Sequence, residues 1–127
     1  MAQRRVRITT NSIVMDAELN DSSTALQVWE ALPLTSQAST WGDEIYFSIP
    51  IHSELENEQE IVELGDIAYW PPGNAFCIFF GPTPMSRGNE IRPASAVNVV
   101  GKLLGDATVF GKVKNGETVT LEQIVGR

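Results

Sequence analysis

The side chains best suited to bind a ligand lie in an aromatic and proline-rich segment, residues 70–84. Within it, Pro71, Pro72 and Gly73 predict a stiff turn between two aromatic strands. Strand alternation divides the second strand between two faces, with Phe76, Ile78 and Phe80 on one and Ala75, Cys77 and Phe79 on the other. Because only one face can meet the interior, the other either packs against loops or forms an apolar groove for a small molecule or an extended, proline-containing peptide.

The candidates for lining such a groove are Tyr46, Phe47, Trp70, Asn74, Phe76, Phe80 and Pro82. Phe76, Phe80 and Pro82 would form its apolar wall. The indole N–H of Trp70 and the amide of Asn74 could fix the orientation of a ligand by hydrogen bonds. For each candidate, ordinary packing in the core is the alternative interpretation.

Other catalytic chemistry finds little support in the residues. His52 is the single histidine and Cys77 the single cysteine, and Cys77 lies in an apolar strand where a thiol is expected to be buried. A Cys–His nucleophilic pair is therefore not predicted, and one cysteine allows neither an internal disulfide nor a thiolate zinc cluster. Residues 105–113 look superficially like a phosphate-binding loop, but Val113 stands where a magnesium-binding Ser or Thr is needed. They are predicted to form a turn and a strand.

A run of acidic residues follows the histidine. Glu54, Glu56, Glu58 and Glu60 occupy alternate positions, so an extended backbone would place their carboxylates on one face. Calcium prefers about six to eight oxygen ligands, but the run lacks the glycine turn and the terminal bidentate glutamate of an ordinary calcium loop. A solvated acidic edge is therefore favoured, and neither a metal nor a cofactor is predicted.

The balance of charge argues against polyanionic partners. The 127 residues include 9 Lys+Arg and 16 Asp+Glu, which gives a net charge of -7. This charge opposes binding to nucleic acid or to an anionic membrane surface. No apolar run approaches the ~20 residues of a membrane-spanning helix, and the first residues lead into an alternating segment rather than a signal-peptide stretch. The sequence therefore predicts a cytoplasmic protein with one domain over residues 1–127.

The elements that must position these residues are mostly short β-strands. Apolar residues recur with period two in runs separated by Gly, Pro, Asn or Asp. Strands are predicted over residues 6–9, 12–19, 44–49, 66–70, 75–80, 97–103, 108–113 and 118–124. About eight strands can close a barrel that is filled by side chains and has no exposed edge. The predicted fold class is mainly β, a closed eight-stranded barrel capped by one or two short helices.

One segment departs from the strand periodicity. Apolar residues at positions 25, 28, 29 and 32 are spaced i, i+3, i+4 and i+7, which places them on one face of a helix. Ser22 or Ser23 can accept hydrogen bonds from the free N–H groups of the first turn, and Pro33 ends the helix. The helix is expected to plug an open end of the barrel, with Trp29 packed in the core.

Three landmarks resemble the cyclophilin family. The segment Thr108-Val109-Phe110-Gly111-Lys112-Val113, preceded by Gly105-Asp106, resembles the Val-Phe-Gly-Lys-Val segment near the C-terminus of cyclophilins. Residues 74–80 resemble the strand with the paired phenylalanines, and the helix at 22–32 lies where the first barrel-plugging helix of that fold would be. With residues 40–50 and 65–73 included, the chain looks most like the small microbial cyclophilin-like proteins of undetermined function. This resemblance implies a closed eight-stranded barrel capped by helices.

The chain also departs from the catalytic pattern of cyclophilins. In place of the family's Phe-His-Arg signature, Ile45-Tyr46-Phe47 precedes Pro50, so the arginine that would polarise the twisting amide is missing. One charge-assisted hydrogen bond contributes about 1.5–3 kcal/mol, so its loss predicts an isomerase activity lower by about one to two decades. The expected function is therefore the binding of a small apolar ligand or a proline-containing peptide, with weak or no isomerase activity.

Two other functions stay open. Arg87 or Arg92, from the long loop after residue 80, could replace the missing arginine in space and make the chain a genuine peptidyl-prolyl cis–trans isomerase. The alternative for both is an ordinary solvated arginine. The aromatic surface could also be a subunit contact of a structural or assembly module. The predicted state is a monomer or a weak homo-oligomer.

Overall fold

The computed structural model describes residues 4–125, whose strands form one antiparallel sheet. The strands are β1 (Arg5–Thr9), β2 (Val14–Leu19), β3 (Leu34–Gln37), β4 (Ser39–Thr40), β5 (Glu44–Ser48), β6 (Asp66–Trp70), β7 (Ala75–Phe79), β8 (Asn98–Leu103) and β9 (Thr118–Ile124). Hydrogen-bonded neighbours follow the order β3-β9-β1-β2-β8-β6-β7-β5-β4. The aromatic strand β7 therefore lies between β6 and β5.

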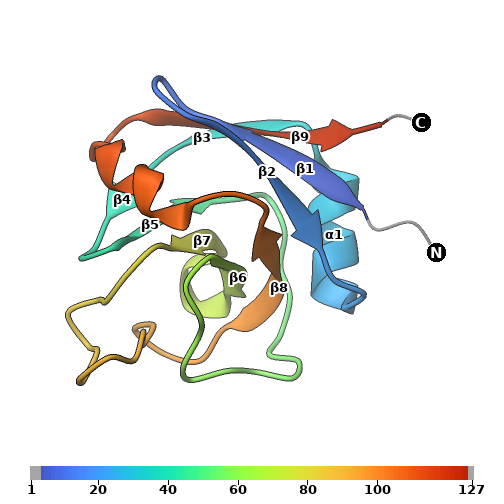
Figure 1. Ribbon diagram of the computed structural model, residues 1–127. Helices are drawn as coiled ribbons and strands as arrows, with labels where there is room; N and C mark the ends of the chain where they lie inside the picture. Colours follow the sequence, from blue (N-terminus) through green and yellow to red (C-terminus); the bar gives the residue numbers. More distant parts are fainter. Residues whose placement is uncertain (1–3, 126–127) are drawn as a thin grey trace.

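The two ends of the sheet meet because β3 and β4 are consecutive in the chain and are separated only by Ala38. The Ala38 N–H donates to the Glu117 carbonyl over 2.8 Å, and the Ala38 carbonyl accepts from the Gly116 N–H over 2.7 Å. The sheet thus curls into a nearly closed barrel (Figure 1). The predicted mainly β fold is confirmed, with nine strands and near closure in place of eight strands and full closure.

The strand prediction is wrong at residues 108–113, which belong to a 3-10 helix, η2 (Ala107–Lys112). The Asp106 side chain caps this helix by accepting from the Thr108 N–H over 3.0 Å. Ala107, Phe110 and Val113 are buried, and their spacing of three residues is the period of a 3-10 helix rather than of a strand. The short strands β3 and β4 were not predicted because polar residues dominate them. The other predicted strands correspond to β1, β2, β5, β6, β7, β8 and β9.

The predicted helix is confirmed as α1 (Ser23–Ala31). The Ser22 hydroxyl is its N-cap and accepts from the Ala25 N–H over 3.1 Å. Trp29 is partly buried and packs against the barrel core, as predicted. Figure 1 shows α1 and η2 on opposite sides of the barrel. Within residues 4–125, no helix has the length and apolar character needed to cross a membrane.

The strand β7 is buried on both faces. Its residues Phe76 and Ile78, with Phe80 just after it, belong to the interior core. The opposite face contributes to an outer cluster, which comprises Val62, Ala68, Ala75, Cys77, Phe79, Ile91 and Val97. Isolated bridges between Gln59 and Val97 and between Val62 and Ile91 hold loop segments over this cluster. The predicted alternation is confirmed, and the second face packs against loops.

Candidate functional site

The aromatic rings predicted to line the groove are mostly inside the protein. Phe47, Phe76 and Phe80 are 2%, 0% and 8% exposed. The Phe47 and Phe76 rings stack with their centroids 5.3 Å apart, because β5 and β7 are neighbours and both residues point inward. The prediction that Phe47 lines an exposed groove, and that Phe76 and Phe80 form its apolar wall with Pro82, is therefore wrong for these three rings.

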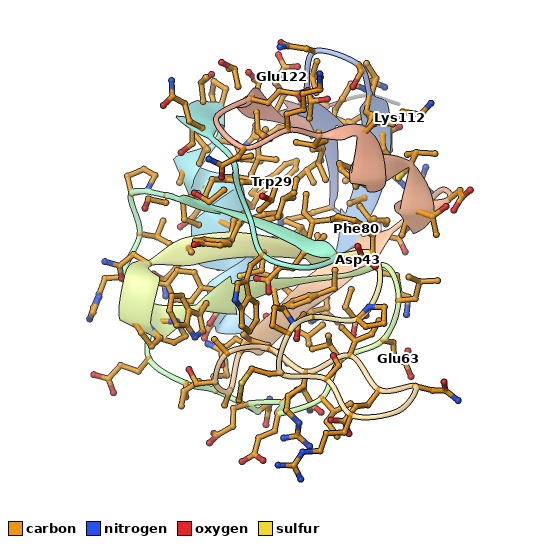
Figure 2. All side chains as sticks on the ribbon, turned by 90° about the vertical axis from the view of Figure 1, so that its left-hand side faces the viewer. Trp29, Asp43, Glu63, Phe80, Lys112 and Glu122 are labelled. Atoms are coloured by element: carbon orange, nitrogen blue, oxygen red, sulfur yellow. The ribbon has the colours of Figure 1, made fainter. Side chains whose placement is uncertain are left out.

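The other predicted groove residues lie at two separate places. Trp70 and Asn74 flank the tight turn between β6 and β7. Pro82 is exposed beyond the other end of β7, where its carbonyl accepts from the Asp43 N–H over 2.9 Å. Figure 2 shows Asp43 beside Phe80 at this end, where the Phe80 N–H donates to the Asp43 carbonyl over 2.9 Å. Tyr46 is partly buried against the outer cluster.

An apolar depression of about 460 Å³ lies at the β6–β7 turn. It is lined by Leu55, Pro71, Pro72, Ser95 and Ala96. Its walls come from three segments that are distant in sequence: the loop before β6, the β6–β7 turn and the segment before β8. We call this site the apolar depression.

The turn that forms one wall is fixed by hydrogen bonds. Residues Pro71–Gly73 form a 3-10 turn, η1, which ends at Asn74 in the left-handed conformation with φ 46°. Asn74 is among the few residue types that adopt this conformation readily, and its Oδ1 accepts from the Tyr69 hydroxyl over 2.8 Å. The Trp70 indole N–H donates to the Ser95 Oγ over 2.7 Å. The Trp70–Ser95 bond therefore joins the turn to the segment before β8, and the Tyr69–Asn74 bond fixes the turn itself.

Leu55 is held at the rim by a buried asparagine that the sequence interpretation missed. Asn98, at the start of β8, is 1% exposed. Its Nδ2 donates to the Glu54 carbonyl over 2.8 Å, and its Oδ1 accepts from the Glu56 N–H over 2.7 Å. These two bonds hold the backbone on both sides of Leu55. The Leu55 side chain lies between them and is 45% exposed. A polar residue inside the apolar run Val97-Asn98-Val99-Val100 was the signal for such a clamp.

Glu56 differs from the other glutamates of the acidic run. Its carboxylate accepts from the Thr24 N–H over 3.1 Å, the Thr24 hydroxyl over 2.9 Å and the Ser23 hydroxyl over 2.7 Å. These bonds satisfy free donors in the first turn of α1 and lower the pKa of Glu56. The prediction of a wholly solvated edge is therefore wrong for Glu56, whereas Glu54, Glu58 and Glu60 are exposed.

A second depression adjoins the first. It has a volume of about 250 Å³, and its lining comprises Glu60, Met85, Arg92, Pro93, Ala94, Ser95 and Ala96. Since Ser95 and Ala96 line both depressions, the two lie on either side of this short segment. Together they form one continuous surface, which we call the groove.

The candidate arginines lie in the loop beside the second depression. The Arg92 Nε donates to the Glu90 Oε2 over 2.7 Å, which raises the pKa of Arg92 and lowers that of Glu90. Arg87 is exposed, and its backbone N–H donates to Glu90 over 3.2 Å. Arg92 therefore faces the groove as one half of an ion pair.

The histidine and the cysteine lie in different environments. Cys77 is 1% exposed in the outer cluster, and burial raises the pKa of its thiol well above the usual range. His52 is exposed, with its Nδ1 3.3 Å from the Asn74 Oδ1. Among residues 4–125, no group of three or more His, Cys, Asp or Glu side chains is arranged to hold a metal ion.

Comparison with known proteins agrees with the fold. A family model described as cyclophilin-like matches residues 4–122. The structure is similar to the solution structure of a hypothetical protein from Archaeoglobus fulgidus, with a TM-score of 0.82 and 42% identity, covering 96% of this chain and 95% of that chain. A search of curated proteins finds no match. The similarity thus extends over nearly the full length of both chains.

Proposed function

The chain belongs to the cyclophilin-like family, and we propose that it binds a small apolar ligand or an extended, proline-containing peptide in the apolar depression. The lining of the depression is the observation that carries this proposal. Leu55, two prolines and Ala96 offer carbon surface to a ligand, and Ser95 is the one polar side chain among the lining residues. A concave, mostly apolar surface with few polar groups is the usual form of a ligand site.

Ser95 supplies the polar contact. Its Oγ accepts the Trp70 indole hydrogen bond over 2.7 Å, so the hydroxyl keeps its own proton to donate. An amide carbonyl of a bound ligand is a suitable acceptor. Since the walls are already fixed by bonds from Trp70, Asn74 and Asn98, binding orders few protein side chains and costs little conformational entropy.

We propose that isomerase activity is weak or absent. No guanidinium lines the apolar depression, and Phe47, the residue at the arginine position of the Phe-His-Arg comparison, is stacked in the core. A bound proline amide would therefore lack the cationic donor that favours its twisted form.

A matched pair of leucine variants tests the proposed site. Calorimetric titration with an uncharged proline-containing peptide should give binding at least about tenfold weaker in Leu55→Glu, because a charge then enters the apolar lining. Leu64→Glu is the control, since Leu64 is 49% exposed against 45% for Leu55 and lines neither depression. Equal affinity of the two variants would overturn the site.

A genuine isomerase that uses Arg92 is the second candidate function. It is favoured by one observation, that Arg92 lines the second depression beside the shared residues Ser95 and Ala96. A protease-coupled proline-peptide assay with Arg92→Ala and Arg87→Ala separates the two functions. Robust turnover that Arg92→Ala removes and Arg87→Ala retains would establish the isomerase in place of the simple binding protein.

A further inference from the structure

The loop that carries Leu55 presents negative charge along the groove. Glu54, Glu58 and Glu60 are exposed, and Glu60 lines the second depression. The backbone of Gln59 is bridged to Val97, with the Gln59 N–H 2.8 Å from the Val97 carbonyl. This antiparallel bridge places Glu60 opposite Ala96, which lines both depressions, and Glu58 opposite Asn98, two residues further along the same segment. Carboxylates therefore border the groove on the side of this loop.

The arginines of the neighbouring loop balance these carboxylates only in part. The Arg92 guanidinium is bonded to Glu90, and the charge of Arg87 also acts on Glu90. Both cations are thus drawn to a carboxylate of their own loop, although the charge of Glu60 also acts on Arg92. Between residues 52 and 66 the sequence contains no Lys or Arg, and the whole chain has a net charge of -7. A ligand that lies along the loop of Leu55 therefore meets an excess of negative charge.

The shape of the groove suits an extended chain. Its two depressions have volumes of about 460 and about 250 Å³ and meet at Ser95 and Ala96. An extended peptide advances about 3.3 Å per residue and places successive side chains on opposite sides. One apolar or proline residue can thus lie in the apolar depression while its neighbours reach the acidic border.

We propose that the occupant of the groove is an extended peptide in which a Lys or Arg stands beside the apolar or proline residue, with its cation placed along Glu54, Glu58 and Glu60. This inference rests on the proposed function and adds the charge of the partner. Attraction between exposed charges is modest, so the cation should improve affinity about threefold to tenfold at low salt. The gain should disappear at high salt, where the screening length falls to about 3 Å at 1 M.

Three peptides with the same proline-containing centre, flanked by Lys, by Gln or by Glu, test the inference in calorimetric titrations. Wild type should bind the Lys peptide most tightly and the Glu peptide least tightly. The triple variant Glu54→Gln, Glu58→Gln, Glu60→Gln should bind all three alike. A control variant should keep the wild-type order of peptide affinities. It loses the same number of charges at exposed residues outside the groove: Asp21→Asn, Glu30→Gln, Glu122→Gln.

The outcomes separate the two proposals. Equal binding of the three peptides by wild type, or a preference for Lys that survives in the Glu54, Glu58, Glu60 variant, overturns the cationic partner and leaves the apolar site standing. Failure of all three peptides to bind overturns the peptide as the ligand of the proposed function, and this inference with it.

Discussion

Glu44 carries a carboxyl group that the fold buries without a full set of hydrogen bonds. The residue is 5% exposed, and its Oε1 lacks a hydrogen-bond partner among the described residues. Burial raises the pKa of Glu44 from 4.5 to about 7, and hydrogen bonding with Cys77 acts in the opposite direction. The other buried residues of β5 are Ile45 and Phe47, so Glu44 is the buried position in this strand where charge and environment conflict.

The native state therefore holds the Glu44 proton more tightly than the unfolded chain does. Its stabilising effect is complete below pH 4.5 and is lost as the pH rises from 4.5 to about 7. At about 1.4 kcal/mol per unit of pKa, the loss amounts to ~3 kcal/mol. Urea unfolding across this range should show wild type losing that much stability relative to Glu44→Gln. Parallel profiles for the two proteins would show that the carboxyl is solvated or paired.

Asn98 is expected to matter for both stability and binding. Its side chain donates to the Glu54 carbonyl and the Thr24 hydroxyl and accepts from the Glu56 N–H. Asn98→Ala leaves buried groups unpaired, which should cost about 2–4 kcal/mol in denaturant unfolding, and it releases Leu55, which should weaken peptide binding. Asn115→Ala is the control, because its exposed side chain accepts one bond, from the Thr40 N–H. Full binding by Asn98→Ala would mean that other contacts hold Leu55.

Sequence reasoning reached only some of the residues that form the proposed site. Composition pointed to the turn that forms one wall of the apolar depression, since Pro71 and Pro72 line the depression and Trp70 donates to Ser95 in its lining. The sequence also placed the rings of Phe47 and Phe76 in the groove, whereas both are buried. Alternation assigns each ring to a face of its strand but does not say which face is inside. Leu55, Ser95 and Ala96 could not be found from sequence, since only the folded chain brings them to the turn.

Among the elements, the close pairing of β8 with β2 depends on Gly101. This residue is paired with Leu19 of β2 and Ile67 of β6, and an added Cβ would lie 2.1 Å from the Glu18 carbonyl oxygen. Backbone must therefore move in Gly101→Ala, which should destabilise the protein by more than about 3 kcal/mol. In Gly111→Ala the nearest atom is 3.9 Å away, in Phe80, so the cost should stay below about 1 kcal/mol. Similar melting temperatures for the two variants would contradict this packing.

The elements themselves were predictable wherever one period dominated. Alternation identified β5, β6 and β7, and helical spacing together with the Ser22 cap identified α1. Periodicity misled where a strand-like alternation and a helical spacing compete, as in η2, whose buried residues are three apart. Periodicity also missed β3 and β4, because their own residues are mostly polar. These two segments are strands because they pair with β9 and β5.

At the scale of the molecule, near closure of the barrel decides what remains for binding. The interior is filled by side chains, and the outer face of β7 is covered by the chain's own loops. Because the outer face of β7 is buried, it offers no aromatic surface for the subunit contact that an assembly module would use. The surface that we propose for binding is the groove at the β6–β7 turn, bordered by an acidic loop. The monomer or weak homo-oligomer stays a prediction.

One NMR titration tests the central claim most directly: an uncharged proline-containing peptide added to isotope-labelled protein, with the cis–trans exchange of the peptide observed in the same samples. We predict amide shifts concentrated at Leu55, Trp70, Ser95 and Ala96, the residues that line or hold the apolar depression, with little acceleration of the exchange. Shifts that avoid these residues, or their absence at saturating peptide, would contradict the site. Strong acceleration of exchange would contradict the assignment of a binding protein with weak or absent isomerase activity.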